Sequence, residues 1–472
     1  MAVALPLFSG CVGKPAVAPP EAPPEAVAPP EALPLGLTTD EVGVLGQLLD
    51  QQIGVEYPVG ETINVGFLCA LSGPDAGWGL PGLCGNNIWI DAVNKCGGLL
   101  VGGVRYPMKM YPFDDEATAS KALQGARELV LEHDVKFINA IGGHCADATA
   151  VFLSDSGVIY ASLVPTDCRP DRPYLVAGGD ITPQCNMLNL RLADMVLPSE
   201  VELGRPRTYA MTTQDCIMSR MNGAWEVGAA IATGYEIIYE EFFSVEQTDF
   251  APVITAIMAT NPDVISLCEA WPTYQTLMWE QMYLQGYEGV VIQNYADWES
   301  NLLKIPPEYA AARYGIDSFP LMDDPWWGDP SWQASFTRAW NARYGPGAPE
   351  DELRRMTGID WDHMVWLMPW CIGAQQWGID HPGEGFPNND QILATLRAMD
   401  SFPTCLGPGH MSGMEMFGID NMIEQPVPMC MFDLEAGDKR IVAQYNFEPW
   451  FQANKGVMIG AVEERGMMHY QR

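Results

Sequence analysis

The chain has 472 residues, of which 48% are hydrophobic, so it is long enough for two or three domains with substantial cores. Lys and Arg number 25 against 60 Asp and Glu, which gives a formal net charge of −35. Nucleic acids and anionic membrane surfaces attract basic patches, so this balance argues against either of them as a partner.

The first eleven residues, MAVALPLFSGC, are apolar and end in small residues before Cys11. This pattern is similar to a bacterial lipobox, in which the cysteine receives lipid and becomes the new N-terminus. Phe8 stands where leucine is usual, and no Lys or Arg precedes the apolar run. An ordinary N-terminus with a chance cysteine is the alternative. We expect residues 1–11 to be a lipoprotein signal, with Cys11 as the lipidation site.

Residues 12–37 are rich in Pro, Ala and Glu and repeat the unit PPE. Such a composition cannot pack a core and favours extended polyproline II. We expect a disordered Pro-rich linker that holds the folded body away from a membrane. No later segment has 18 uninterrupted apolar residues, so the sequence predicts no membrane-spanning helix.

A short helix is predicted near residues 38–54, and the folded body is expected to begin at residue 62. From there, strands alternate with helices. The predicted strands are 63–71, 105–114, 135–143 and 158–165, and the helices that follow the first three are 80–98, 116–134 and 145–157. Buried strands that alternate with helices are typical of a parallel, doubly wound sheet.

The same alternation starts again at residue 207. Its predicted strands are 207–215, 235–243, 262–270 and 289–296, and its helices are 219–233, 250–261 and 272–286. Two more helices are expected at 331–344 and 360–378, and a late strand at 444–450. Ligands of open parallel sheets bind beyond the carboxyl ends of the strands, so two such units that face each other predict a cleft between them.

Sequence motifs for covalent catalysis and nucleotide binding are missing. The chain has no GxSxG, no GxxxxGK[ST] and no HExxH. His144 and the cysteines lack metal-ligand spacing, and the eleven cysteines besides Cys11 leave both buried thiols and disulfides open. We therefore expect a protein that is not an enzyme, with no catalytic residue, no metal and no cofactor.

Three stretches in combination resemble a known family: INVGFLCALSGPDAGWG (63–79), PFDDEATASKALQGARELVLEHDVKFINAIGGHCADATA (112–150) and GVIYASLVPT (157–166). They are similar to solute-binding proteins of ABC transporters for branched-chain amino acids and amides, the leucine/isoleucine/valine-binding type with periplasmic-binding fold type I. The resemblance implies two Rossmann-like lobes with parallel sheets joined by a hinge. It assigns residues 62–182 and 325–380 to lobe 1, and residues 183–320 and 381–460 to lobe 2.

The resemblance also implies ligand contacts in lobe 1. Ser72 and Trp78 match a loop that covers the ligand. Four residues stand where small hydroxyl residues bind a ligand carboxylate at a helix N-terminus, namely Cys145, Ala146, Asp147 and Thr149. Asp147 would repel a carboxylate, so it favours a cationic or amide ligand if it points into the cleft, and helix capping is its alternative role. Thr166 matches a position that meets the ligand through its hydroxyl and amide.

In lobe 2, Trp271 matches an aromatic residue after the third strand, with Glu269 nearby. Asp297 is the nearest candidate for the acidic residue that holds a ligand ammonium. The tyrosine expected after strand 207–215 is absent, and residues 216–218 read Cys-Ile-Met instead. Trp271 could alternatively belong to the core, as tryptophans at strand-to-helix junctions often do.

We therefore predict the extracytoplasmic, lipid-anchored solute-binding component of an ABC importer, located in the periplasm or at the cell surface. It would capture a small polar solute, such as an amino acid, an amide or a related organic acid, by hinge closure and present it to a permease. A ligand-binding sensory protein that signals closure to a membrane partner is the first alternative. A hydrolase that acts in the cleft, with Asp147 as a candidate catalytic group, is the second.

Overall fold

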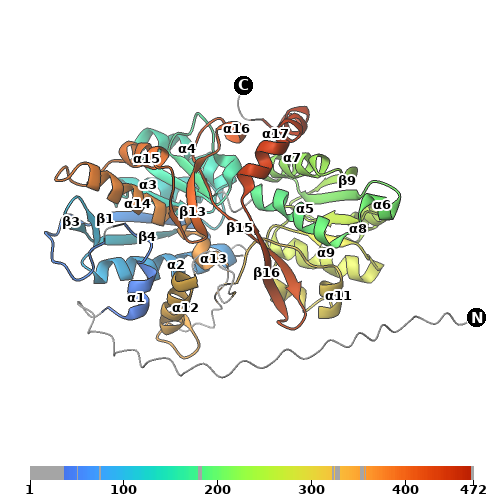
Figure 1. Ribbon diagram of the computed structural model, residues 1–472, viewed down its shortest axis with the longest axis horizontal. Helices are drawn as coiled ribbons and strands as arrows, with labels where there is room; N and C mark the ends of the chain where they lie inside the picture. The colour runs from blue at the N-terminus through green and yellow to red at the C-terminus, as the bar shows by residue number, and fades with distance from the viewer. Residues whose placement is uncertain are drawn as a thin grey trace, which may run out of the picture.

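The computed structural model describes residues 37–49, 51–73, 76–178, 183–321, 324, 330–350, 356 and 358–468. The expected signal, the lipidation site Cys11 and the linker up to residue 36 lie outside these residues. Figure 1 shows two α/β lobes side by side, one coloured blue to cyan with orange helices and the other green to yellow. The predicted fold class, α/β with two Rossmann-like lobes, is confirmed, although the sheet of lobe 1 is parallel only in part, because two of its strand pairs near the C-terminus of the chain are antiparallel.

An eight-stranded sheet forms the centre of lobe 1, in the order β12-β13-β14-β7-β6-β5-β1-β4. Its strands are β1 (Ile63–Cys69), β4 (Met108–Asp114), β5 (Phe137–Ala140), β6 (Ile159–Ser162), β7 (Leu175–Gly178), β12 (Phe402–Thr404), β13 (Gly407–Ser412) and β14 (Met422–Glu424). The central strand β1 pairs in parallel with β4 and β5, and all of its residues except Asn64 are buried. A parallel strand covered on both faces reads as a continuous apolar run, which is why this strand is predictable from sequence.

Helices cover both faces of this sheet. They are α1 (Thr39–Val44), α2 (Ala76–Lys95), α3 (Ala119–Leu131), α4 (His144–Ser156), the 3₁₀ turn η2 (Pro165–Asp167), α12 (Pro330–Tyr344), α13 (Ile359–Asp362), α14 (Met364–Asp380) and α15 (Asn389–Ala398), with a hairpin of β2 (Leu99–Val101) and β3 (Val104–Tyr106). Neighbouring strand residues alternate between the two faces, so Phe137 and Ile159 pack with α2 and α14 while Ile138 and Tyr160 pack with α3 and α4.

The folded body begins earlier than expected. Leu37 falls within the predicted linker but is buried in the core of lobe 1. Helix α1 packs beside α12, where the indole nitrogen of Trp332 donates to the carbonyl oxygen of Val44 (3.1 Å). The start at residue 62 and the end of the linker at residue 37 are therefore corrected, because the short apolar segment before residue 62 finds its core partners far along the chain.

Lobe 2 contains a four-stranded parallel sheet in the order β11-β10-β8-β9. Its elements are α5 (Gln184–Val196), α6 (Glu200–Leu203), β8 (Thr208–Gln214), α7 (Ile217–Ala232), β9 (Glu236–Phe243), α8 (Ala251–Met258), β10 (Val264–Ser266), α9 (Pro272–Gln285), β11 (Val290–Ile292), α10 (Trp298–Asn301), α11 (Pro307–Ala312) and the C-terminal α17 (Phe447–Glu464). Helix α17 lies against α7 so closely that a Cβ at Gly228 would stand 2.9 Å from the backbone of Met458.

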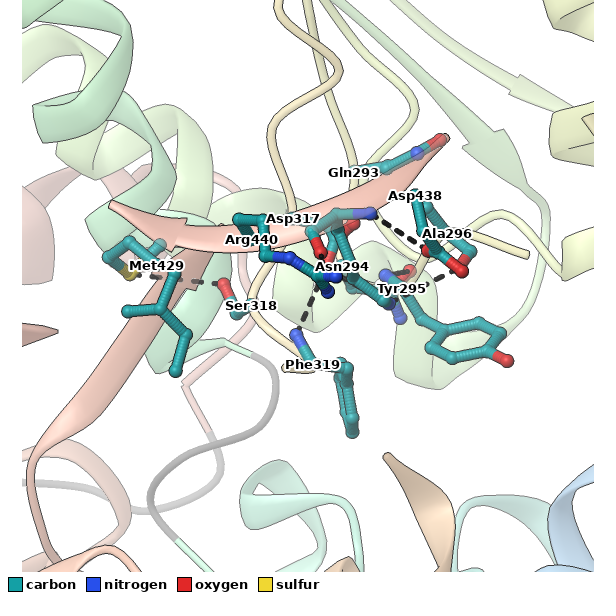
Figure 2. Close-up of polar contacts among 12 residues, drawn as sticks. Gln293, Asn294, Tyr295, Ala296, Asp317, Ser318, Phe319, Met429, Asp438 and Arg440 are labelled. Carbon is teal, nitrogen blue, oxygen red and sulfur yellow. Dashed lines mark hydrogen bonds and ion pairs between the residues drawn. The ribbon is translucent and has the colours of Figure 1, made fainter. Parts of the chain in front are cut away.

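A two-stranded hairpin, β15 (Val427–Asp433) with β16 (Asp438–Tyr445), lies between the lobes, after the short helix α16 (Met414–Phe417) and β14. It is joined to the segment that leaves lobe 2, because Asp317 and Cys430 exchange two backbone hydrogen bonds (3.1 and 2.7 Å). Figure 2 shows this junction, where Ser318 meets Met429 of the hairpin beside Asn294.

Two assignments near the C-terminus differ from expectation. Residues 381–460 were predicted to belong to lobe 2, but β12, β13 and β14 extend the sheet of lobe 1 through the pairing of β14 with β7. The predicted strand 444–450 is also wrong beyond Tyr445, because α17 begins at Phe447. Pro449 lies in the first turn of this helix, where its missing N–H costs nothing.

Two further features concern the cysteines and the helices of the described region. The eleven cysteines of the described region are all free thiols, and ten of them are buried. Within the same region, no helix is both long enough and apolar enough to cross a bilayer.

Candidate ligand-binding cavity

A cavity of about 340 Å³ lies between the lobes, at the carboxyl ends of the strands of both sheets. Lobe 1 lines it with Trp78, Ala117, Ile141, Gly142, Gly143, Leu163 and Val164, and lobe 2 with Cys216, Ile217, Met218, Val245, Glu269, Ala270, Trp271 and Asn294. Apart from Trp78, each of these residues follows shortly after β4, β5, β6, β8, β9, β10 or β11. This is the location that the strand-end rule predicts for ligands of parallel sheets.

Trp78 reaches across from lobe 1 to lobe 2. It lies in the first turn of α2, which begins at Ala76 rather than at the expected residue 80. Its ring centroid is 5.3 Å from that of Tyr295 and 6.2 Å from that of Phe319, in an edge-on arrangement with the latter. Burial lowers the pKa of His363 to about 4, so at neutral pH its Nε2–H is a neutral donor to the carbonyl oxygen of Trp78 (3.2 Å). The aromatic cover of the cavity is therefore held from both lobes.

The loop after β5 uses glycine for a close backbone approach. Gly142 and Gly143 have φ values of +97° and +64°, and a Cβ at Gly142 would stand 1.9 Å from the Ser162 hydroxyl oxygen. The backbone N–H of Gly143 and the hydroxyl of Ser162 both donate to Oδ2 of Asp167 (2.7 and 2.8 Å). Burial raises the pKa of Asp167 to about 6, although these hydrogen bonds oppose the shift. The side chain of Asp167 thus engages the N-cap N–H of α4.

The polar side chains of the cavity come from lobe 2. Glu269 is 5% exposed and lies in the turn after β10, where its carbonyl oxygen accepts a hydrogen bond from the buried amide of Gln214 (2.9 Å). Burial raises the pKa of the Cys216 thiol, and the nearby charge of Glu269 adds to this shift. The amide oxygen of Asn294 accepts from Gln275 (3.1 Å), which fixes its side chain.

Trp271 forms the aromatic part of this wall. It is the N-cap residue of α9 and stacks on Tyr274, with ring centroids 5.3 Å apart and an interplanar angle of 19°. Trp78 and Trp271 are thus the two predicted ligand contacts that the structure brings to the cavity, one from each lobe.

The other predicted contacts in lobe 1 do not line the cavity. Ser72 is exposed and donates to Oδ2 of Asp114 (2.5 Å). Asp147 is exposed and pairs with Arg172 (2.5 Å) rather than pointing into the cleft. Cys145 and Ala146 are buried in the first turn of α4, and Thr149 is buried one turn further on, with its hydroxyl donating to the carbonyl oxygen of Cys145 (2.9 Å).

Thr166 and Asp297 also lie away from the lining. Thr166 is buried in η2, and its hydroxyl oxygen has no hydrogen-bond partner among the described residues. Asp297 caps α10, where its carboxylate accepts from the backbone N–H and the hydroxyl of Ser300 (3.3 and 2.6 Å). The lining residues that the sequence analysis did not select, such as Leu163 and Asn294, carry one common signal, which is their place directly after a strand.

The chain belongs to the periplasmic binding protein family, whose profile matches residues 62–429. The resemblance inferred from sequence is therefore confirmed. Members of this family are solute-binding proteins and not enzymes, and their location is extracytoplasmic. Among the described residues, no cluster of three or more His, Cys, Asp or Glu side chains is placed to hold a metal ion.

Several solved structures share the fold. An ABC transporter substrate-binding protein from Sphaerobacter thermophilus is 18% identical, with a TM-score of 0.61 over 82% of this chain and 99% of its own. A solute-binding protein of an ABC transporter from Rhodopseudomonas palustris BisB5, in complex with 3,4-dihydroxybenzoic acid, is 17% identical, with a TM-score of 0.61 over 82% and 97%. An amino acid ABC transporter substrate-binding protein from Pseudomonas fluorescens Pf-5 is 11% identical, with a TM-score of 0.62 over 83% and 97%. At these identities, the likeness concerns the fold.

Proposed function

We propose that this protein captures a small organic solute between its two lobes and delivers it to the permease of an ABC importer. The observation that carries the proposal is a cavity of about 340 Å³ whose wall is divided between the strand ends of both lobes. This volume falls within the range of small-molecule sites. Two of the solved structures with this fold support the proposal: one is a solute-binding protein of an ABC transporter in complex with 3,4-dihydroxybenzoic acid, and the other is an amino acid ABC transporter substrate-binding protein.

Capture proceeds by hinge closure in this proposal. Trp78 of lobe 1 contacts Tyr295 and Phe319, which belong to the segments that leave lobe 2. These contacts exist only when the lobes are together, so a solute that touches both walls favours the closed form over the open one. Trp78 and Trp271 are the proposed ligand contacts, because they are large aromatic groups on opposite walls.

Thermal-shift screening against amines, amino acids, amides and aromatic acids tests the binding step. A solute that binds only the folded protein raises Tm, and the rise grows with the logarithm of its concentration once that concentration exceeds Kd. We expect Trp78→Ala to reduce that shift at a given solute concentration, whereas substitution of an exposed aromatic residue on α9, Tyr283→Ala, leaves it intact. An equal shift in both variants contradicts the proposed site.

Small-angle scattering with the same solute tests closure, because the radius of gyration falls when the lobes approach. Uptake of the labelled solute by cells with and without the gene then separates import from sensing. Loss of uptake supports the importer, and unchanged uptake together with tight binding supports the sensory alternative.

We also propose that Cys11 is lipidated and that residues 12–36 tether the lobes to a membrane, on the strength of the lipobox-like start and the Pro-rich composition. Mass spectrometry of the mature protein tests this, since lipidation adds acyl mass at Cys11 and Cys11→Ser releases the protein from the membrane fraction.

A further inference from the structure

We infer that the cavity selects a positively charged organic solute, an ammonium group carried on an apolar body. The inference rests on the proposed function and names the class of solute that the same site takes. It follows from the charged and aromatic side chains of the cavity wall. It also follows from the interactions that the possible anion-binding groups, a helix N-terminus and nearby cationic side chains, already make within the protein.

The described lining residues include one carboxylate and no ammonium or guanidinium. The carboxylate is that of Glu269, which is 5% exposed. The other ionisable lining residue is Cys216, whose pKa is raised by burial, so it is a neutral thiol at pH 7. A carboxyl group in a largely apolar cavity pairs favourably with a cation and unfavourably with a second carboxylate.

Aromatic surface lies on both walls. Trp78 and Trp271 contribute indole groups to the lining from lobe 1 and lobe 2. Indole faces attract ammonium groups more strongly than other aromatic side chains do, and the attraction grows when water is excluded. Val245, Ile217 and Met218 supply aliphatic surface for the body of the solute.

An acidic side chain already bonds to the helix terminus that could hold a carboxylate. The first helix after β5 is α4, and the N–H of Gly143 at its N-terminus donates to Asp167 (2.7 Å). Asp167 is a buried acidic group directly behind this wall, and burial raises its pKa to about 6. A solute carboxylate at this terminus would lie close to a second acidic group.

Two cationic side chains, Lys439 and Arg172, form ion pairs with carboxylates of the protein. Lys439 lies over the ring of Tyr295 (4.7 Å from the centroid) but is 2% exposed and pairs with the fully buried Asp317 (3.2 Å). Asp317 and Tyr295, both labelled in Figure 2, are not among the described residues that line the cavity. Arg172 is held by Asp147 on the outer side of α4.

Calorimetry with solutes of equal shape and different charge tests the inference. The probes are phenethylamine (cation), 3-phenylpropanoate (anion), phenylalanine (zwitterion) and 3-phenylpropanamide (neutral), with isopentylamine and 4-methylpentanoate as an aliphatic pair. We expect the better of the two amines to bind at least tenfold more tightly than its matched anion, and phenethylamine to bind more tightly than phenylalanine.

Glu269→Gln sharpens the test because it removes charge and keeps shape. We expect it to weaken amine binding by about 10- to 100-fold and to change 3-phenylpropanamide binding less than threefold. The matched control is Glu280→Gln on α9, whose carboxylate pairs with Lys304 away from the cavity and whose loss leaves amine affinity unchanged.

Tighter binding of an anion or zwitterion than of its matched amine overturns the inference and leaves the solute-binding function standing. Binding of other solutes in the wider screen, with no affinity for either amine, has the same meaning. Equal amine affinity in Glu269→Gln and the parent protein overturns it as well. Absence of binding by solutes of every charge class overturns the proposed function itself.

Discussion

The two walls of the cavity differ in chemistry. Lobe 1 presents the Trp78 ring, aliphatic side chains and the bare backbone of Gly142 and Gly143. Lobe 2 presents a carboxylate, a thiol and an amide in addition to Trp271. The polar groups of lobe 1 lie behind its wall, where Asp167 and Ser162 bond to each other and to the loop backbone. Lobe 1 therefore supplies the cover and the apolar shape of the cavity, whereas lobe 2 supplies its polar side chains.

Among the substitutions considered, Gly142→Ala is expected to distort the cavity wall of lobe 1 most and to destabilise the protein most. The new Cβ would stand 1.9 Å from the Ser162 hydroxyl and 2.6 Å from Asp167 Oδ2, at a φ of +97°. We expect the free energy of unfolding to fall by about 4 kcal/mol and binding to be lost. Urea denaturation measures the first effect.

Gly73→Ala is the matched control, because its φ is +78° but none of the described residues places an atom within 4 Å of the added Cβ. It isolates backbone strain, so its cost should be about 1 kcal/mol. Equal costs at the two glycines would show that the Asp167 cluster does not limit the space at the wall.

Asp167→Asn tests whether the carboxylate behind this wall is charged. Its pKa is raised by burial from 3.8 to about 6, so its contribution to stability is fully present below pH 3.8 and is lost as pH rises through 6. Relative to the Asn variant, the parent protein should lose up to about 3 kcal/mol between pH 4 and 7. Parallel urea curves across this range measure the difference, and a pH-independent difference would mean that Asp167 titrates normally.

Trp78→Ala and Trp271→Ala compare the aromatic groups of the two walls. Each should weaken solute binding about 10- to 100-fold without unfolding the protein. Of the two tryptophans, Trp78 is the one that contacts Tyr295. A double-mutant cycle should therefore give a coupling of about 0.5–1.5 kcal/mol for Trp78 with Tyr295 and about zero for Trp271 with Tyr295. Equal couplings would show that Trp78 does not join the lobes as described.

Thr166→Val should have the smallest effect. The Thr166 hydroxyl is buried, lacks a hydrogen-bond partner within the described part of the chain and does not line the cavity. We expect affinity to change less than twofold and the free energy of unfolding to change by less than about 1 kcal/mol. A tenfold loss of affinity in calorimetry would restore Thr166 as a ligand contact.

Sequence patterns sufficed for the two lobes and for the edge at which the cavity forms. Buried strands such as β1 are apolar runs with clear ends, and the residues after those ends become the cavity wall. The lobe that receives β12 to β14 could not be predicted, because an isolated strand carries no local signal for the sheet edge that it joins. Tyr445 ends β16 one residue before the N-cap of α17, and the alternating apolar residues there fit either element.

Individual contacts were harder to predict than loops. Asp147 and Asp167 both stand near the N-terminus of α4, and the sequence analysis selected Asp147. The helical phase turns Asp147 outward to Arg172, and the loop after β6 brings Asp167 to Gly143 instead. Pairings of this kind depend on the relative positions of two loops, which no single segment encodes.

The packing of Trp78 on Tyr295 and Phe319 is made by protein groups alone. Closure of the two lobes is therefore favourable to some extent before any solute binds, because opening would expose three aromatic rings to water. Molecules that are closed without solute must open before they can bind it. The apparent affinity is therefore reduced in proportion as the fraction of open molecules falls. Under the proposed function, the permease must then distinguish the loaded closed form from the empty closed form by something other than overall shape.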